Sequence, residues 1–151
     1  MTRPLKAALA GLGLLAAGVL LPVEARAQDS GPDHVLENFR RFEAANPGMS
    51  LLNSRSRQMS EGYVLEYNFE LTEGVNYVFA GMCDENCSSM RMFVKDSSGQ
   101  ILERVTTSVY VAVSMTPSST GTYTVSYVMS GCRYRYPDPG CHAGMRQYRF
   151  R

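Results

Sequence analysis

Four cysteines are the residues of this 151-residue chain with the most definite chemistry. Cys83 and Cys87 end one strand-like run, and Cys132 and Cys141 follow nearer the C-terminus. With His142 they form a ligand set that zinc accepts, but structural zinc sites usually contain closer pairs such as C-x2-C. In an exported chain, cysteines oxidise to disulfides rather than bind zinc, and the N-terminal residues of this chain indicate export. We therefore expect two disulfides and no metal. The spacings also contain neither the C-x-x-C redox motif nor the C-x-x-C-H haem motif.

Four cysteines permit three pairings. The local pairing joins Cys83 to Cys87 and Cys132 to Cys141. It closes two short loops, so the entropic stabilisation from each bridge is limited to roughly 2–3 kcal/mol. The sequence alone does not choose among the three.

Catalytic chemistry has little support among the remaining residues. A nucleophilic serine or cysteine needs a base beside it and a third group that orients the base. The only two histidines are His34 and His142, and no G-x-S-x-G motif occurs. Glu66 and Glu70 share one face of an expected strand, where carboxylates are usually solvated rather than an acid–base pair. We predict a protein that is not an enzyme and has no cofactor.

The C-terminal segment combines arginines with tyrosines. Guanidinium groups bind carboxylate and phosphate through paired hydrogen bonds, and aromatic faces add stacking and cation–π contacts. If the second cysteine pair held the two halves of this segment together, they would form one patch for an anionic ligand. The alternative is an ordinary strand with tyrosines inward and arginines in water. The candidate patch consists of Arg133, Tyr134, Arg135, Arg146, Tyr148 and Arg149.

The first 27 residues have the pattern of a signal peptide. Basic Arg3 and Lys6 precede an apolar run over 7–23, and Ala25-Arg26-Ala27 supplies the small-x-small cleavage pattern. A retained transmembrane anchor is the alternative, but the run is short and interrupted by glycines and Pro22. We therefore expect a periplasmic or secreted protein without a transmembrane span after cleavage.

The remainder, residues 28–151, suits a single domain with one core. The whole chain has 15 basic and 14 acidic residues, and without the leader 12 basic and 13 acidic residues remain. The net charge of this remainder is −1. Nucleic-acid binding based on bulk positive charge is excluded by this balance.

One helix and a series of short strands are expected after the leader. Val35, Leu36, Phe39 and Phe42 form an apolar stripe on a helix over 33–45, which Asn46-Pro47-Gly48 ends. We expect this helix to pack on the edge of the domain. Beyond it, apolar residues alternate with polar ones, with turn residues between the runs. The expected strands are 63–71, 75–81 as its hairpin partner, 90–94, 100–105, 109–115, 123–129 and 146–150.

Strands of this length and spacing, with no helical segments between them, are typical of an antiparallel sandwich or barrel. We predict an all-β fold, an antiparallel jelly-roll-like β-sandwich with one N-terminal helix. Its parts are the signal peptide 1–27, a helical segment 28–48 and the sandwich domain 49–151.

The order of the turn and strand motifs resembles the bacterial pre-peptidase C-terminal domain family, in its small, cysteine-bearing exported variants. The resemblance covers about residues 60–132. It is carried by Leu71-Thr72-Glu73-Gly74-Val75, Gly81-x-Cys83-Asp84-x-x-Cys87, Val94-x-Asp96-x-x-Gly99 and Gly121-x-Tyr123-x-Val125. It implies a jelly-roll-like sandwich that acts as an accessory or binding module.

The chain departs from the family pattern after the second cysteine. Family members commonly have acidic residues there, whereas this chain has Ser88, Ser89, Met90 and Arg91. Calcium prefers six to eight oxygen ligands, several of them carboxylates, so we expect no calcium site. The predicted function is a non-enzymatic binding or accessory module of the cell envelope, with an envelope glycan, lipid head group or envelope protein as partner. The alternative is a structural subunit of an envelope assembly that docks through the helix of 33–45.

Overall fold

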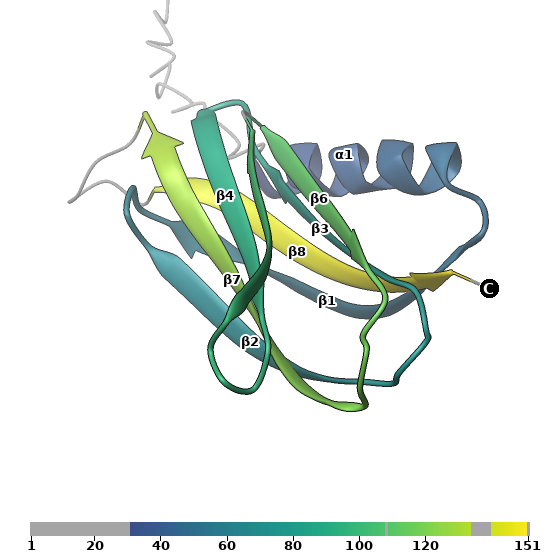
Figure 1. Ribbon diagram of the computed structural model, residues 1–151. Coiled ribbons are helices and arrows are strands. Elements are labelled where there is room, and N and C mark those ends of the chain that lie inside the picture. The colour runs from purple at the N-terminus through teal and green to yellow at the C-terminus, as the bar shows by residue number, and fades with distance from the viewer. Residues whose placement is uncertain (1–30, 108, 134–139, 151) are drawn as a thin grey trace, which may run out of the picture.

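The structure is a computed structural model that describes residues 31–107, 109–133 and 140–150. Two antiparallel sheets pack face to face, and a helix lies on the outer side of one of them (Figure 1). The predicted fold class, an antiparallel β-sandwich with one N-terminal helix, is confirmed. The predicted leader, residues 1–27, lies outside the described residues. Within the described part, no helix is long and apolar enough to span a membrane.

The described chain forms one helix and eight strands. Sheet A has the strand order β1-β8-β3-β6, and sheet B has the order β2-β7-β4-β5. The elements are α1 (Gly31–Ala45), β1 (Met49–Met59), β2 (Val64–Leu71), β3 (Tyr77–Cys83), β4 (Cys87–Lys95), β5 (Ile101–Thr107), β6 (Tyr110–Met115), β7 (Gly121–Cys132) and β8 (Cys141–Phe150).

The core between the sheets is filled by alternate residues of the central strands, as period-two patterning requires. Tyr127 is fully buried at its centre, and its hydroxyl donates to the backbone oxygen of Met82 at 3.0 Å. Gly81 leaves room for that ring, because a Cβ there would lie 2.3 Å from Tyr127 Cε2. Flexible methionines fill much of the remaining space. The buried methionines in this cluster are Met59, Met90, Met92, Met115, Met129 and Met145.

A second, smaller core lies between α1 and the outer side of sheet A. Val35 and Phe39 of the helix are buried against Val78, Ala80, Met82 and Tyr148 of the sheet. Gly144 of β8 makes this contact close, since a Cβ there would lie 2.8 Å from the Phe39 ring. Three of the four residues of the apolar stripe therefore pack on their own domain, whereas Leu36 is exposed. The helix begins two residues before Asp33.

Two expectations about the strands are wrong. The chain after Gly48 forms β1, an 11-residue edge strand that was not predicted because most of its side chains are exposed and show no apolar alternation. The segments 63–71 and 75–81 are not hairpin partners. β2 pairs with β7 in sheet B, whereas β3 pairs with β6 and β8 in sheet A. The turn at Thr72–Gly74 therefore carries the chain from one sheet to the other.

Candidate binding site

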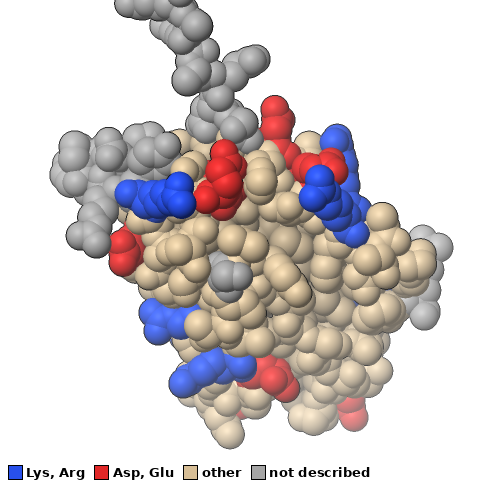
Figure 2. All heavy atoms as spheres, turned by 90° about the horizontal axis from the view of Figure 1, so that it is seen from above, with Lys and Arg blue, Asp and Glu red and all other residues tan. Residues whose placement is uncertain are grey.

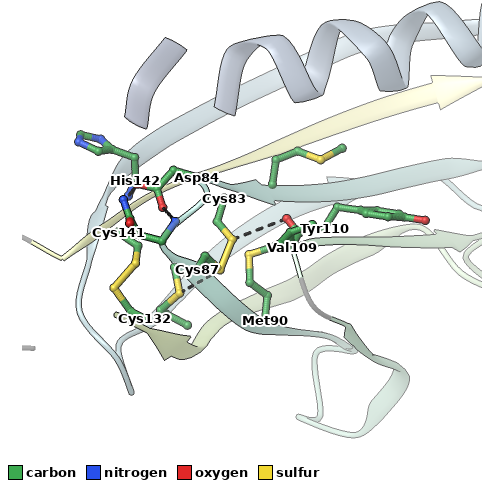
Figure 3. The surroundings of a disulfide bond; sticks show 12 residues. Cys83, Asp84, Cys87, Met90, Val109, Tyr110, Cys132, Cys141 and His142 are labelled. Carbon is green, nitrogen blue, oxygen red and sulfur yellow. Dashed lines mark hydrogen bonds between the residues drawn. A yellow bond between two sulfur atoms is a disulfide. The ribbon is translucent and has the colours of Figure 1, made fainter. Parts of the chain in front are cut away.

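Both disulfides lie at one end of the sandwich and join the two sheets (Figure 3). Cys83 ends β3 of sheet A and is bonded to Cys87, which begins β4 of sheet B. Cys132 ends β7 of sheet B and is bonded to Cys141, which begins β8 of sheet A. Of the three pairings, the structure therefore has the local one. Each bridge fixes a point at which the chain passes between the sheets.

The loop inside the first bridge supports the start of α1. Asp84 is buried, and its carboxylate accepts hydrogen bonds from the backbone N–H groups of His142 at 2.8 Å and Asn86 at 3.0 Å. Gly31, the first helical residue, packs against both Asp84 and the His142 ring, with no space for a Cβ. A carboxylate at this end of a helix is stabilised by the helix dipole. Asp84 therefore has a structural role here.

Cys83 also connects two elements on the other side of the bridge. Its backbone N–H donates to the Val109 carbonyl oxygen at 3.2 Å, and its own carbonyl oxygen accepts from Asn38 Nδ2 of α1 at 3.4 Å. In Figure 3, Val109 and Tyr110 lie beside Cys83, and the Tyr110 ring is directed away from the bridge. The residue thus holds α1 and the start of β6 at a fixed separation.

Between α1 and the start of β6 lies a groove of about 440 Å³. Its apolar surface includes the Tyr110 side chain, which belongs to a residue 56% exposed. Its polar rim comes from the helix and the residue that follows it. The groove is lined by Asn38, Arg41, Phe42, Asn46, Met82, Val109 and Tyr110.

The polar side chains at this rim retain hydrogen-bonding capacity. Asn46 Nδ2 donates to the Phe42 carbonyl oxygen at 2.7 Å, and Asn38 Nδ2 donates to Cys83. Within the described residues, no donor is bonded to either side-chain oxygen. Arg41 Nε lies 3.1 Å from Glu37 Oε1, which leaves its terminal nitrogens for other acceptors. An exposed ring facing amides and a guanidinium is a suitable lining for a ligand with apolar faces and polar edges.

The arginine–tyrosine patch expected from the sequence is not assembled as predicted. Tyr148 is buried under α1, and its hydroxyl donates to Glu43 Oε1 at 2.9 Å. Arg146 Nη1 lies 2.7 Å from the same carboxylate oxygen, and the Arg146 guanidinium carbon is 4.4 Å from the centroid of the Phe39 ring. Burial, followed by the hydrogen bond to Glu43, raises the pKa of Tyr148. Both side chains attach the helix to the sheet, because they lie on the face of β8 that α1 covers.

The structure describes two other members of that patch, Arg149 and Arg133. Arg149 is exposed, three positions along β8 from Arg146 and therefore on the opposite face of the strand. Arg133 is exposed just beyond β7. Tyr134 and Arg135 lie outside the described residues. On the face shown in Figure 2, basic and acidic side chains are interleaved rather than gathered into one patch of a single sign.

The other titratable groups considered in the sequence make local contacts. His34 Nδ1 lies 3.3 Å from Glu85 Oε2, and His142 Nε2 lies 3.1 Å from the Gln58 amide nitrogen. Glu66 Oε1 lies 2.8 Å from Lys95 Nζ, and this hydrogen bond holds the pKa of Glu66 below its usual value. Among the described residues, no group of three or more His, Cys, Asp or Glu side chains could hold a metal ion.

Sequence reasoning did not find the groove, because its two walls come from segments more than 60 positions apart. Asn38 and Arg41 of the helix, and Asn46 just after it, are polar residues beside the predicted stripe, and their pattern is that of side chains in water. The only sequence signal for the groove was the pair Val109-Tyr110 at the start of a strand. Because side chains of a strand alternate between its two faces, two successive large apolar residues leave one of them exposed to water.

No protein-family model matches the chain, and no curated protein matches it. Among solved structures, the chain is similar to a carbohydrate-binding module determined in complex with β-1,4-galactotriose. The identity is 16% over 70% of this chain and 83% of that chain, with a TM-score of 0.39. It is also similar to an α-L-arabinofuranosidase determined with bound arabinose, at 6% identity and a TM-score of 0.34; the match covers 70% of this chain and 24% of that one. Likenesses at this level are no basis for assigning a function.

Proposed function

We propose that the protein is an exported, non-enzymatic binding module of the bacterial cell envelope, and that it binds a glycan in the groove between α1 and β6. The observation that carries this proposal is the lining of the groove. One exposed tyrosine ring faces a helix rim that supplies amide and guanidinium groups.

A sugar ring suits this combination of groups. Its C–H faces are apolar and stack on an aromatic ring, whereas its hydroxyl edge needs both donors and acceptors. The amides of Asn38 and Asn46 offer free oxygen acceptors, and Arg41 offers donors. Binding without chemistry agrees with this lining, which contains no His, Ser, Cys, Asp or Glu side chain.

Export is supported by two independent features. The signal-peptide pattern of residues 1–27 indicates secretion, and two disulfides are typical of an oxidising compartment. The resemblance to pre-peptidase C-terminal domains stays a prediction that agrees with a binding role.

The alternative function, a structural subunit that docks through the helix, has less support, because most of the apolar side of α1 packs on sheet A. Phe39 is buried against sheet A, and the Phe42 ring lies 5.8 Å from that of Tyr148. Most of the apolar stripe is therefore occupied within the molecule, and Leu36 is the one member of it that stays exposed to a partner.

The proposal is tested by glycan binding of the full chain, exported from a bacterial host with its own leader. Binding to isolated envelope polysaccharides and to an array of neutral oligosaccharides is measured for the wild type and for Tyr110→Ala. We expect the variant to lose about 2 kcal/mol of binding free energy, the usual cost of removing an aromatic anchor.

The matched control is Tyr63→Ala, which removes another exposed tyrosine that does not line the groove. It should bind as the wild type does. Equal affinity of Tyr110→Ala and wild type, or no glycan bound by the wild type, would exclude the groove as a glycan site.

A further inference from the structure

The outer face of sheet B carries basic side chains around one phenylalanine. Arg91, Phe93 and Lys95 occupy alternate positions of β4, whereas the residues between and before them, Met90, Met92 and Val94, are fully buried in the core. Because successive side chains of a strand point to opposite faces, the first three lie on the outer face. Within the described residues, no helix covers this face, since α1 packs on sheet A.

The register of the sheet places further groups around Phe93. Its cross-strand neighbours are Arg104 of β5 and Ser126 of β7. The Arg104 guanidinium carbon lies 5.2 Å from the centroid of the Phe93 ring. An arginine held over a ring keeps its in-plane N–H donors free, so this contact orients the guanidinium toward a planar anion such as a carboxylate.

The charges on this face do not cancel. Lys95 is paired with Glu66 at 2.8 Å. Arg91 Nε donates to Ser130 Oγ at 2.8 Å, and neither Arg91 nor Arg104 is paired with a carboxylate among the described residues. Two positioned guanidinium groups are therefore left without a counter-charge.

Apart from Glu66, the acidic residue of β2 on this face is Glu70, which lies far from the two arginines. Glu70 follows Glu66 by four positions along β2, about 13 Å away at the rise of a strand. Its carboxylate accepts from the Thr122 hydroxyl. Of the charged side chains that strand alternation places on this outer face, the basic ones therefore lie on β4 and β5 and the acidic ones on β2.

We propose that the outer face of sheet B is a second binding surface, and that its ligand is an acidic polysaccharide whose carboxylates are bound by Arg91 and Arg104. The neighbouring hydroxyls of Ser130 and Thr106 suit the hydroxyl groups of such a chain. Single-stranded nucleic acid is bound through free aromatic faces, but Arg104 covers the Phe93 ring. A membrane surface is bound through inserted apolar side chains, whereas the next outward residues along β4, Arg91 and Lys95, and the residues directly across from Phe93 are charged or carry a hydroxyl.

The test uses the full chain with polygalacturonate, in which every sugar bears a carboxylate, and with the same polymer after complete methyl esterification. The wild type should bind the acid form about tenfold or more tightly than the ester, as expected for two charge-assisted hydrogen bonds, and added salt should weaken this preference. Replacing both arginines, in Arg91→Ala/Arg104→Ala, should remove the preference.

Arg55→Ala/Arg57→Ala is the matched control, because it removes the same charge from exposed positions of β1 in the other sheet. It should keep the preference, and so should Tyr110→Ala, which separates this surface from the groove. The proposal is overturned if the wild type does not prefer the acid form, or if Arg91→Ala/Arg104→Ala still prefers it. Binding of oligothymidine or anionic phospholipid vesicles as tight as that of polygalacturonate would also overturn it.

Discussion

At the scale of single residues, two buried aromatic rings determine what their neighbours must be. Tyr127 fills the centre of the sandwich and requires a glycine at position 81, while Phe39 requires one at position 144. Both glycines lie in central strands, where a residue without a side chain normally weakens the sheet. The close approach of a ring explains why they are present.

Gly81→Ala should destabilise the fold by about 1–3 kcal/mol, because its Cβ would overlap a fully buried tyrosine that has no space to move. Urea unfolding measures the free energy. Gly121→Ala is the matched control, since nothing lies within 4 Å of the added atom. A loss no greater for Gly81→Ala than for Gly121→Ala would show that the ring can shift.

Two buried tyrosines predict a loss of stability in alkali. Burial raises the pKa of Tyr127 and of Tyr148 in the folded protein, so the folded state holds these protons more tightly than the unfolded chain does. The contribution of these two tyrosines to the free energy of unfolding is complete below the unfolded pKa of about 10, and it falls as the pH rises above that value. Unfolding free energy measured from pH 8 to 11 should decline at the top of this range. Tyr148→Phe should reduce the decline, and an unchanged slope would contradict this assignment.

At the scale of elements, the sequence predicted the positions of the helix and most strands better than it predicted which strands pair with each other. The helix was found because Val35, Phe39 and Phe42 recur on one side, and β4 and β7 because their apolar residues alternate. β3 is instead an unbroken apolar run that is buried on both faces. β1 was missed because it lies at a sheet edge, where no buried face imposes a pattern. The pairing of β2 with β7 depends on contacts between residues 50 or more positions apart, which no local signal records.

The first disulfide should control the groove more than the second does. The backbone of Cys83 bonds both to Asn38 of α1 and to Val109 at the start of β6, and the bridge to Cys87 anchors this backbone between the two walls. We expect Cys83→Ala/Cys87→Ala to weaken glycan binding in the groove about tenfold. Cys132→Ala/Cys141→Ala, which removes a bridge that makes no such contacts, should bind nearly as the wild type does. Equal losses in the two variants would assign both bridges to general stability.

At the scale of the whole molecule, the alternating pattern and the turn residues were sufficient to predict a sandwich, since each buried face must meet another. The site was not predictable in the same way. The expected patch placed Arg146 and Tyr148 together at the surface, but the sequence does not show that α1 would cover that side of β8. The groove exists only because the helix, β3 and β6 meet in three dimensions.

The two bridges should act together on the stability of the sandwich. Cys87 and Cys132 are cross-strand neighbours, so both bridges close the same end of the two sheets. With either one intact, that end remains closed, and we expect each single-bridge variant to lose roughly 2–3 kcal/mol. Removing all four cysteines should cost more than the two losses combined, because residues that share one structural unit are coupled. Unfolding free energies of the four proteins of this cycle measure the coupling, and strict additivity would show that the bridges stabilise the two crossings independently.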